Sequence, residues 1–241
     1  EDEQYARAAR KKVSGVLTRQ TEEGWFPELG GVDTGYSFLT LEYLAYCYSF
    51  QPGDELRSAL DRALEFLSFF VHPDLTTGRE YNLCGNSYIS LLAAAIMSEF
   101  SPVARGLLAA GLRFGDPLRQ LAQDDLSRTY HLYNGLLVYD YFRKNRDAFN
   151  GDIRPLPFLG DPYRRFFGAA ALLSVKTENY YAAAAGHSGG LIKIYPLPPS
   201  PPSGPVSCRD AGYSIRLSDG RTLSSFRLSR KNPVRWDGEG R

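Results

Sequence analysis

Cysteine and histidine are both scarce in this sequence. The 241 residues include three cysteines, Cys47, Cys84 and Cys208, which lie far apart and form no CxxC pair. Such an odd, scattered set argues against a disulfide framework or a structural zinc site. The three histidines form no pair at metal-ligand spacing, and the chain lacks a phosphate-binding glycine loop. Its GxSxG sequence, GHSGG at 186–190, lies between two predicted strands and not at the strand-to-helix turn of a nucleophile elbow. The sequence therefore gives little support to a metalloenzyme, a kinase or a serine hydrolase, and it predicts no metal site.

An excess of charge and long apolar runs are also missing. Lysine and arginine number 28 against 27 aspartates and glutamates, for a net charge of +1. No overall field therefore attracts nucleic acid or an anionic membrane. No stretch approaches the roughly 18 consecutive apolar residues of a membrane helix, and the N-terminal residues lack the apolar core of a signal peptide. These absences predict a soluble protein with no membrane span and no nucleic-acid partner, while its compartment and oligomeric state stay open.

Tyrosine, by contrast, is abundant. The chain has 16 Tyr, 14 Phe and 2 Trp within an ordinary globular composition of 43% hydrophobic and 23% charged residues. A tyrosine joins an apolar ring to a hydroxyl that needs a partner. A folded protein with a polar cleft suits this composition, as one large domain or two smaller ones.

The first 150 residues have the periodicity of successive helices. It predicts helices at 5–17, 34–50, 54–70, 87–99, 102–113 and 127–146. Residues 34–50 are apolar nearly all round, as expected of an inner helix, whereas 54–70 have one apolar stripe, as expected of an outer helix. This alternation favours an incomplete α/α toroid of helical hairpins over a solenoid, for which we find no repeat of fixed period.

After residue 150 the pattern changes to short apolar runs separated by turn residues. Strands are predicted at 169–176, 180–185, 190–195, 213–217 and 222–226, with a hairpin turn at 218–221. The alanines of 182–185 would also suit a helix by propensity alone. The predicted fold class is α+β, with a toroid-like helical domain at 1–150, a linker at 151–165 and an antiparallel, β-sandwich-like module at 166–241.

Two polar loops that lead into apolar helices contain the chemistry of a sugar cleft. The first loop contains Trp25, Asp33 and Tyr36. The rings of Trp25 and Tyr36 would stack on sugars, while the carboxylate of Asp33 binds sugar hydroxyls. The alternative is that Trp25 plugs the helical ring and Asp33 caps a helix. The second loop contains Arg79, Glu80, Asn86 and Tyr88, which would neutralise a carboxylate and supply a phenol for proton transfer. Its alternative is a capped turn with Asn86 or Ser87 as the N-cap.

The histidines differ in their settings. His72 precedes Pro73 at a helix end, where it suits the helix dipole better than catalysis. His131 lies beside Tyr130 in a helix, and Asn134 follows one turn later, which makes either an active-site face or a satisfied polar core. His187 lies in a glycine-rich turn between two predicted strands, where simple exposure is the alternative to a functional role.

The sequence resembles the heparinase II/III-like family of polysaccharide lyases. The resemblance rests on EGWFPELGGVDTGYSFLTLEYLA, on DELRSALDRALEFLSFFVHPD, and on LLSVKTENYYAAAAGHSGGLIKIY followed by DAGYSIRLSDGR. It extends diffusely over most of the chain, and it implies an α/α toroid joined to β-sandwich domains. The chain is shorter than such enzymes in both parts, and is interpreted as a possible fragment.

The activity that this resemblance implies is β-elimination on an acidic, uronate-containing polysaccharide. An amide or cation neutralises the uronate carboxylate, a Tyr or His removes the C5 proton, and a Tyr returns a proton to the leaving oxygen. By residue type and loop position, the implied catalytic residues are Asn86, Tyr88 and His187. The implied substrate-binding residues are Trp25, Asp33, Tyr36, Arg79, Glu80 and His131. This chemistry needs no cofactor.

Two other functions stay open at this point. A glycan-binding or polysaccharide-assembly protein would keep the cleft without a complete acid and base set, and the near-neutral charge suits it. A glycoside hydrolase would use paired carboxylates such as Glu28 and Asp33, whose separation would be diagnostic.

Overall fold

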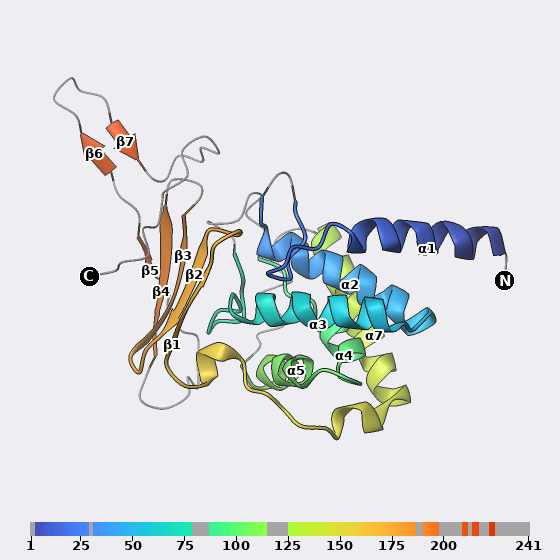
Figure 1. Cartoon of the computed structure of the whole chain (residues 1–241). Coiled ribbons are helices and arrows are strands. Elements are labelled where there is room, and N and C mark those ends of the chain that lie inside the picture. The colour runs from blue at the N-terminus through green and yellow to red at the C-terminus, as the bar shows by residue number, and fades with distance from the viewer. Residues whose placement is uncertain are drawn as a thin grey trace.

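The protein has an α+β fold in which helices precede an antiparallel sheet (Figure 1). The computed structural model describes residues 3–28, 31–78, 87–114, 125–186, 190–197, 209–211, 214–216 and 222–224. The helices in these ranges are α1 (Glu3–Leu17), α2 (Thr34–Phe50), α3 (Asp54–Ser68), α4 (Leu91–Met97), α5 (Pro102–Phe114) and α7 (Asp125–Lys144). No helix within the described part of the chain is both long enough and apolar enough to span a membrane.

The six helices confirm the helical periodicity of the sequence, with one shift at α4. The predicted helix began at residue 87, but α4 begins at Leu91, because the Ser90 side chain accepts a hydrogen bond from the backbone N–H of Ala93 and caps the helix there. Residues 87–89 precede the cap in non-helical conformation. Tyr88 therefore belongs to a connecting segment.

Helix α2 is less enclosed than its apolar sequence predicts. One face is fully buried, with Phe38, Leu41 and Ala45 packed among α3 and α4. The opposite face exposes aromatic rings, including Tyr43 and Phe50. Within the described ranges, α2 is thus an inner helix on one side only.

The principal sheet has five antiparallel strands in the order β1-β2-β3-β4-β5. These are β1 (Tyr163–Phe167), β2 (Leu172–Lys176), β3 (Tyr180–Ala185), β4 (Leu191–Pro196) and β5 (Arg209–Ala211). The strands predicted at 169–176, 180–185 and 190–195 correspond to β2, β3 and β4, whereas β1 and β5 were not predicted. The alanine run is a strand because it lies between β2 and β4, with Ala183 paired to both Ser174 and Lys193.

A separate two-stranded hairpin follows the sheet. Strands β6 (Ser214–Arg216) and β7 (Thr222–Ser224) pair antiparallel, with Arg216 opposite Thr222. This pairing confirms the predicted hairpin, whose turn at 218–221 lies outside the described residues.

The sheet packs directly against the C-terminal end of α3. The rings of Phe66 and Phe167 meet edge to face with centroids 4.9 Å apart. The hydroxyls of Ser174 and Tyr181 both donate to the carbonyl oxygen of Phe69, each at 2.7 Å. The buried residues of helices and sheet form one hydrophobic cluster, which includes Phe158 from the predicted linker. The connection between the two parts is therefore packed as part of the core.

The loop before α2 binds the turn between β1 and β2. The carboxylate of Glu23 accepts the backbone N–H groups of Ala169 and Ala170 at 2.9 and 3.0 Å. The same carboxylate accepts the indole N–H of Trp25 at 3.0 Å. One acidic side chain thus joins the first polar loop to the sheet.

A buried histidine lies at this contact between helices and sheet. His72 follows α3, and its Nδ1 lies 2.9 Å from the Thr76 hydroxyl and 3.0 Å from the Tyr195 hydroxyl of β4. Burial, and then the positive charge of nearby Lys193, hold the pKa of His72 well below its ordinary value. His72 is therefore neutral in the folded protein at neutral pH, in a packing role.

We expect this histidine to make the protein less stable in mild acid. Below about pH 6.5, His72 binds a proton in the unfolded chain but not in the folded protein. The free energy of unfolding should therefore fall by up to about 1.4 kcal/mol for each unit by which the pH is lowered. Denaturant titrations between pH 7.5 and 5 would measure this slope. In His72→Gln the slope should be shallower over the same range, and an equal slope in the variant would contradict the assignment.

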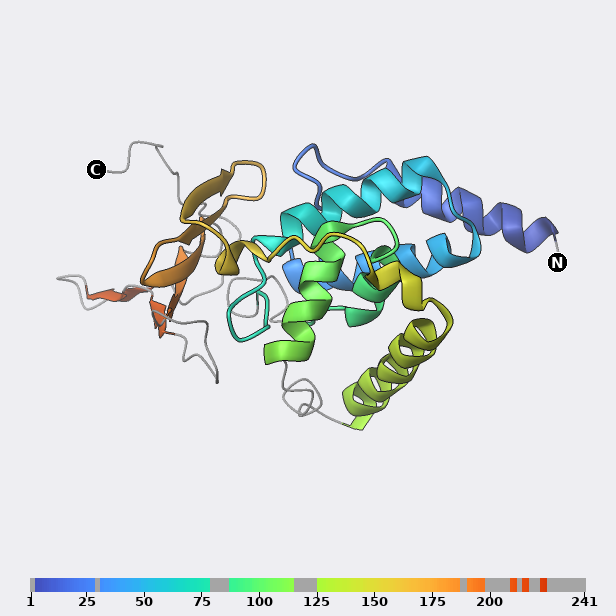
Figure 2. The same ribbon diagram turned by 90° about the horizontal axis from the view of Figure 1, so that it is seen from below.

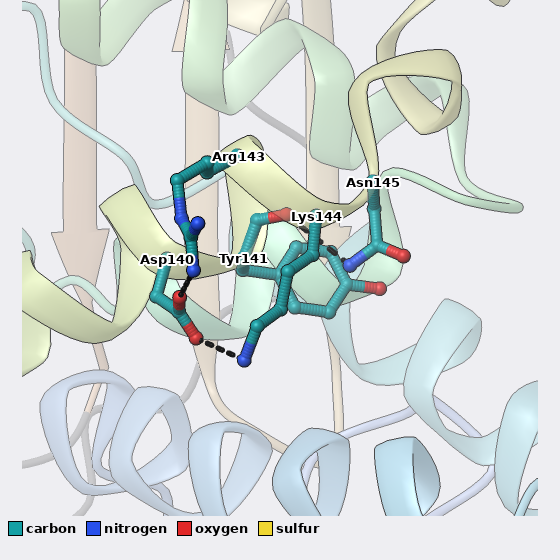
Figure 3. A network of polar contacts seen from close by, with 5 residues as sticks. All are labelled: Asp140, Tyr141, Arg143, Lys144 and Asn145. Carbon is teal, nitrogen blue, oxygen red and sulfur yellow. Dashed lines mark hydrogen bonds and ion pairs between the residues drawn. The ribbon is translucent and has the colours of Figure 1, made fainter.

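The last turn of α7 is closed by a small polar network (Figure 3). The carboxylate of Asp140 accepts from Lys144 Nζ at 2.6 Å and Arg143 Nη2 at 3.0 Å, while the Asn145 amide donates to the Tyr141 carbonyl at 3.2 Å. The hydrogen bonds from Lys144 and Arg143 lower the pKa of Asp140. These pairs are exposed, so they contribute little to stability, and they end the helix with cations as its dipole favours.

Candidate functional site

A buried carboxylate joins three separate segments of the helical part. It belongs to Glu42 in α2, which is only 3% exposed. Its partners come from the segment before α4 and from α7. We call these four residues the Glu42 cluster: Glu42, Tyr88, Ser90 and Asn134.

The Glu42 cluster is fully connected by hydrogen bonds. The hydroxyls of Tyr88 and Ser90 both donate to Oε2 of Glu42. The side-chain amide of Asn134 donates to Oε1 of Glu42 at 3.2 Å and to the Tyr88 hydroxyl at 3.1 Å. Buried carboxylates are tolerated where donors surround them, and three donors to this one lie among the described residues. The arrangement therefore holds the Tyr88 phenol in a defined position.

The elements that position these side chains follow from the local sequence. Glu42 lies on the same side of α2 as Phe38 and Ala45, a face that is otherwise apolar and packed. Ser90 has two roles, since its oxygen also caps α4. Asn134 is buried although its neighbour Tyr133 on α7 is exposed. The cluster thus forms where α2, α4 and α7 converge.

A second contact ties the preceding chain to α2. The Thr77 hydroxyl donates to the Thr34 hydroxyl at 2.9 Å, and both residues are fully buried. Thr77 and Tyr88 lie on either flank of the segment 79–86, and both bind α2. The predicted site residues Arg79, Glu80 and Asn86 belong to that segment, which lies outside the described residues.

The remaining histidines of the predicted site are not described either. His187 lies outside the described residues, as does the side chain of His131. The backbone of α7 nevertheless places His131 one turn before Asn134, on the same side of the helix.

The three predicted residues of the first loop have different settings. Trp25 is 7% exposed, with its ring in the hydrophobic core. Asp33 is fully buried and caps α2 by accepting the backbone N–H of Tyr36 at 3.0 Å. Tyr36 is 37% exposed. Of the three, only Tyr36 presents a ring to solvent, and Asp33 and Trp25 take the structural positions that were the alternatives to sugar binding.

Glu28 and Asp33, the two carboxylates considered for a hydrolase, both accept hydrogen bonds from other residues of the protein. Glu28 is half-buried and accepts a hydrogen bond from the Thr40 hydroxyl at 3.3 Å. Asp33 is engaged as the helix cap. Each of the two carboxylates thus has a hydrogen-bond partner within the fold.

Sequence reasoning missed Glu42 and Ser90. Glu42 is the sole charged residue among the seventeen residues of α2. A lone acid in an apolar helix needs buried partners, so this was a usable signal. Ser90 carried no signal beyond its capping propensity.

The chain matches no family model, no curated protein and no solved structure. In the described part of the chain, no three His, Cys, Asp or Glu side chains gather as a metal site would require. The chemistry of the site must therefore be argued from the Glu42 cluster itself.

Proposed function

We propose that this protein is a carbohydrate-active enzyme of the polysaccharide lyase type, acting on an acidic, uronate-containing polysaccharide. The observation that supports it most is the position of Tyr88, whose half-buried phenol is hydrogen-bonded to a buried carboxylate and an amide. Tyr88 was assigned to proton transfer from sequence alone. The cluster supplies the two groups that such a phenol needs, a proton acceptor and an orienting donor.

In the proposed β-elimination, Tyr88 removes the C5 proton while its own hydroxyl proton passes to Glu42. The electrons of the C5–H bond form the C4–C5 double bond, and the bond from C4 to the glycosidic oxygen breaks. The proton held by the Tyr88–Glu42 pair then returns to that oxygen. The transfer from Tyr88 to Glu42 uses two groups that are already hydrogen-bonded, as efficient general acid–base catalysis requires.

The C5 proton becomes acidic enough only when the neighbouring carboxylate is neutralised. Amide donors aimed at that carboxylate would stabilise the developing negative charge. We assign this role to Asn86, while both N–H groups of the Asn134 amide are engaged by Glu42 and the Tyr88 hydroxyl and orient the phenol. His187 and His131 remain the proposed histidines of the site, and Arg79, Glu80 and Tyr36 the proposed contacts to the sugar.

We also propose that the helices form an incomplete α/α toroid and that the sheet belongs to a β-sandwich. The packed pairs α2 with α3 and α4 with α5 suit the hairpins of an incomplete α/α toroid. The five-stranded sheet, packed on one side against α3, suits one layer of a β-sandwich. On this interpretation the chain is a heparinase II/III-like lyase or a portion of one.

A panel of uronate polymers tests the function, with ultraviolet absorbance reporting the unsaturated product. We expect product from at least one polymer, and a turnover about 100-fold or more lower in Tyr88→Phe, the scale of losing one essential proton-transfer group. Tyr180→Phe, on the sheet, is the matched control and should match the wild type. If no polymer yields product while one still binds, the glycan-binding alternative replaces the lyase.

A further inference from the structure

Helix α1 projects from the body of the protein as an arm. Both views show it extending away from the other helices toward the N-terminus (Figure 1, Figure 2). None of its residues is buried, and among the described residues those of α1 that pack against the hydrophobic core are the half-buried Val13, Val16 and Leu17 near its C-terminal end. Tyr5, near the other end, is 76% exposed.

This arm concentrates positive charge that the rest of the chain lacks. Residues 3–19 contain five basic residues and one acidic residue, whereas the remainder has 23 basic and 26 acidic residues. The acidic residue, Glu3, pairs with Arg10 at 2.7 Å. Arg7, Lys11 and Lys12 are exposed, and they make no ion pair with any residue in the described ranges. A local cationic surface thus stands on a nearly neutral protein.

We propose that α1 is an electrostatic binding arm for an acidic polysaccharide, outside the Glu42 cluster. Arg7, Arg10 and Lys11 share one side of the helix, so a flexible anionic chain lying along that side meets several cations at once. Binding of this kind releases counterions from the polymer and raises its local concentration near the protein. The identity of the polymer rests on the function proposed above.

The composition of the arm favours a glycan over other polyanions. The apolar side of α1 offers only Tyr5 and small alanines beyond the part that packs on the core, too little to enter a bilayer. A groove for single-stranded nucleic acid would interleave aromatic residues with the cations to stack bases, and only Tyr5 lies among the cations of α1. An acidic glycan needs charge contacts alone at this surface.

Charge removal tests the proposal without unfolding the protein, since no residue of α1 is buried. The variant Arg7→Gln/Arg10→Gln/Lys11→Gln removes the three cations of that side and keeps helix propensity. The control Arg143→Gln/Lys144→Gln/Arg164→Gln removes three exposed charges elsewhere. Binding to polygalacturonate and to heparin is measured by titration at low and high salt. We expect the α1 variant to bind at least one polymer about tenfold or more weakly at low salt, with a shallower salt dependence, and the control to match the wild type.

Several results would overturn the proposal. They are equal losses in both variants, no binding of the wild type to either polymer, or a preference of the wild type for duplex DNA or anionic lipid vesicles in competition. Its failure is distinguishable from that of the lyase. Binding through α1 without product formation would support the binding arm and contradict the lyase. Product formation with unchanged binding by the α1 variant would support the lyase and contradict the binding arm.

Discussion

Replacing Glu42 with alanine is expected to lower the free energy of unfolding by about 3 kcal/mol, because three donors, one half-buried and two buried, lose their acceptor together. The hydroxyls of Tyr88 and Ser90 and the Asn134 amide all donate to this one carboxylate. No other acidic residue lies in α2 to replace it. Denaturant unfolding of the variant would measure the loss, and a change below about 1 kcal/mol would contradict the view that the cluster holds these segments together.

Glu42→Gln separates the structural role of this residue from its chemical role. The amide keeps the size of the side chain and one carbonyl acceptor, so we expect a stability loss of no more than about 1.5 kcal/mol. It cannot take up a proton from Tyr88, so elimination should still fall about 100-fold or more. A Gln variant that is stable and fully active would show that Glu42 only packs, and would remove it from the mechanism.

Gly106→Ala should destabilise the protein about as much as Glu42→Ala, for a steric reason. Gly106 lies in α5, where an added Cβ would stand 1.9 Å from the carbonyl oxygen of Arg154 and 3.0 Å from its carbon. Both are backbone atoms, so the helix and the segment 152–156 would have to separate. That movement would strain the hydrogen bonds from Arg154 N to the Pro102 oxygen and from Arg105 Nε to the Asp152 oxygen. We expect a loss of about 3 kcal/mol, seen as a Tm lower by roughly 6 °C or more.

The same substitution at Gly135 is the matched control. Gly135 lies in α7, where an added Cβ meets nothing within 4 Å. Alanine is favoured over glycine in a helix interior by about 1 kcal/mol, so Gly135→Ala should be neutral or stabilising. Loss of stability in both variants would point to a general intolerance of α5 and α7, and not to the close contact at Gly106.

Much of the fold followed from local pattern. The capping residue Asp33 and the one-sided stripe of α3 are local signals, and both elements begin where these signals predict. The alanine strand β3 was ambiguous because its conformation is decided by pairing with β2 and β4, which lies beyond local propensity. Strand β1 was missed for a related reason, since its YRRFF sequence has no clear alternation and its pattern makes sense only at the edge of the sheet.

The candidate site was less accessible from the sequence than the fold. Tyr88 was selected by residue type within a polar loop, and nothing local indicated that its partner would be 46 residues earlier in α2. Asn134 was noted only beside His131, whereas its amide reaches Glu42 92 residues away. Contacts at such separations depend on how helices pack, and one sequence alone carries no record of that packing.

The carboxylate of Glu23 has a consequence for the order of folding. It spans 146 residues of sequence to reach the backbone of Ala169, whereas each strand of the sheet pairs with its immediate neighbour along the chain. Sequentially adjacent pairings form early because their loops are short, and a contact across so long a loop forms late. We therefore expect the helices and the sheet to organise separately and to dock last, so the hydrogen bonds around Glu23 would be the first to open in native-state hydrogen exchange.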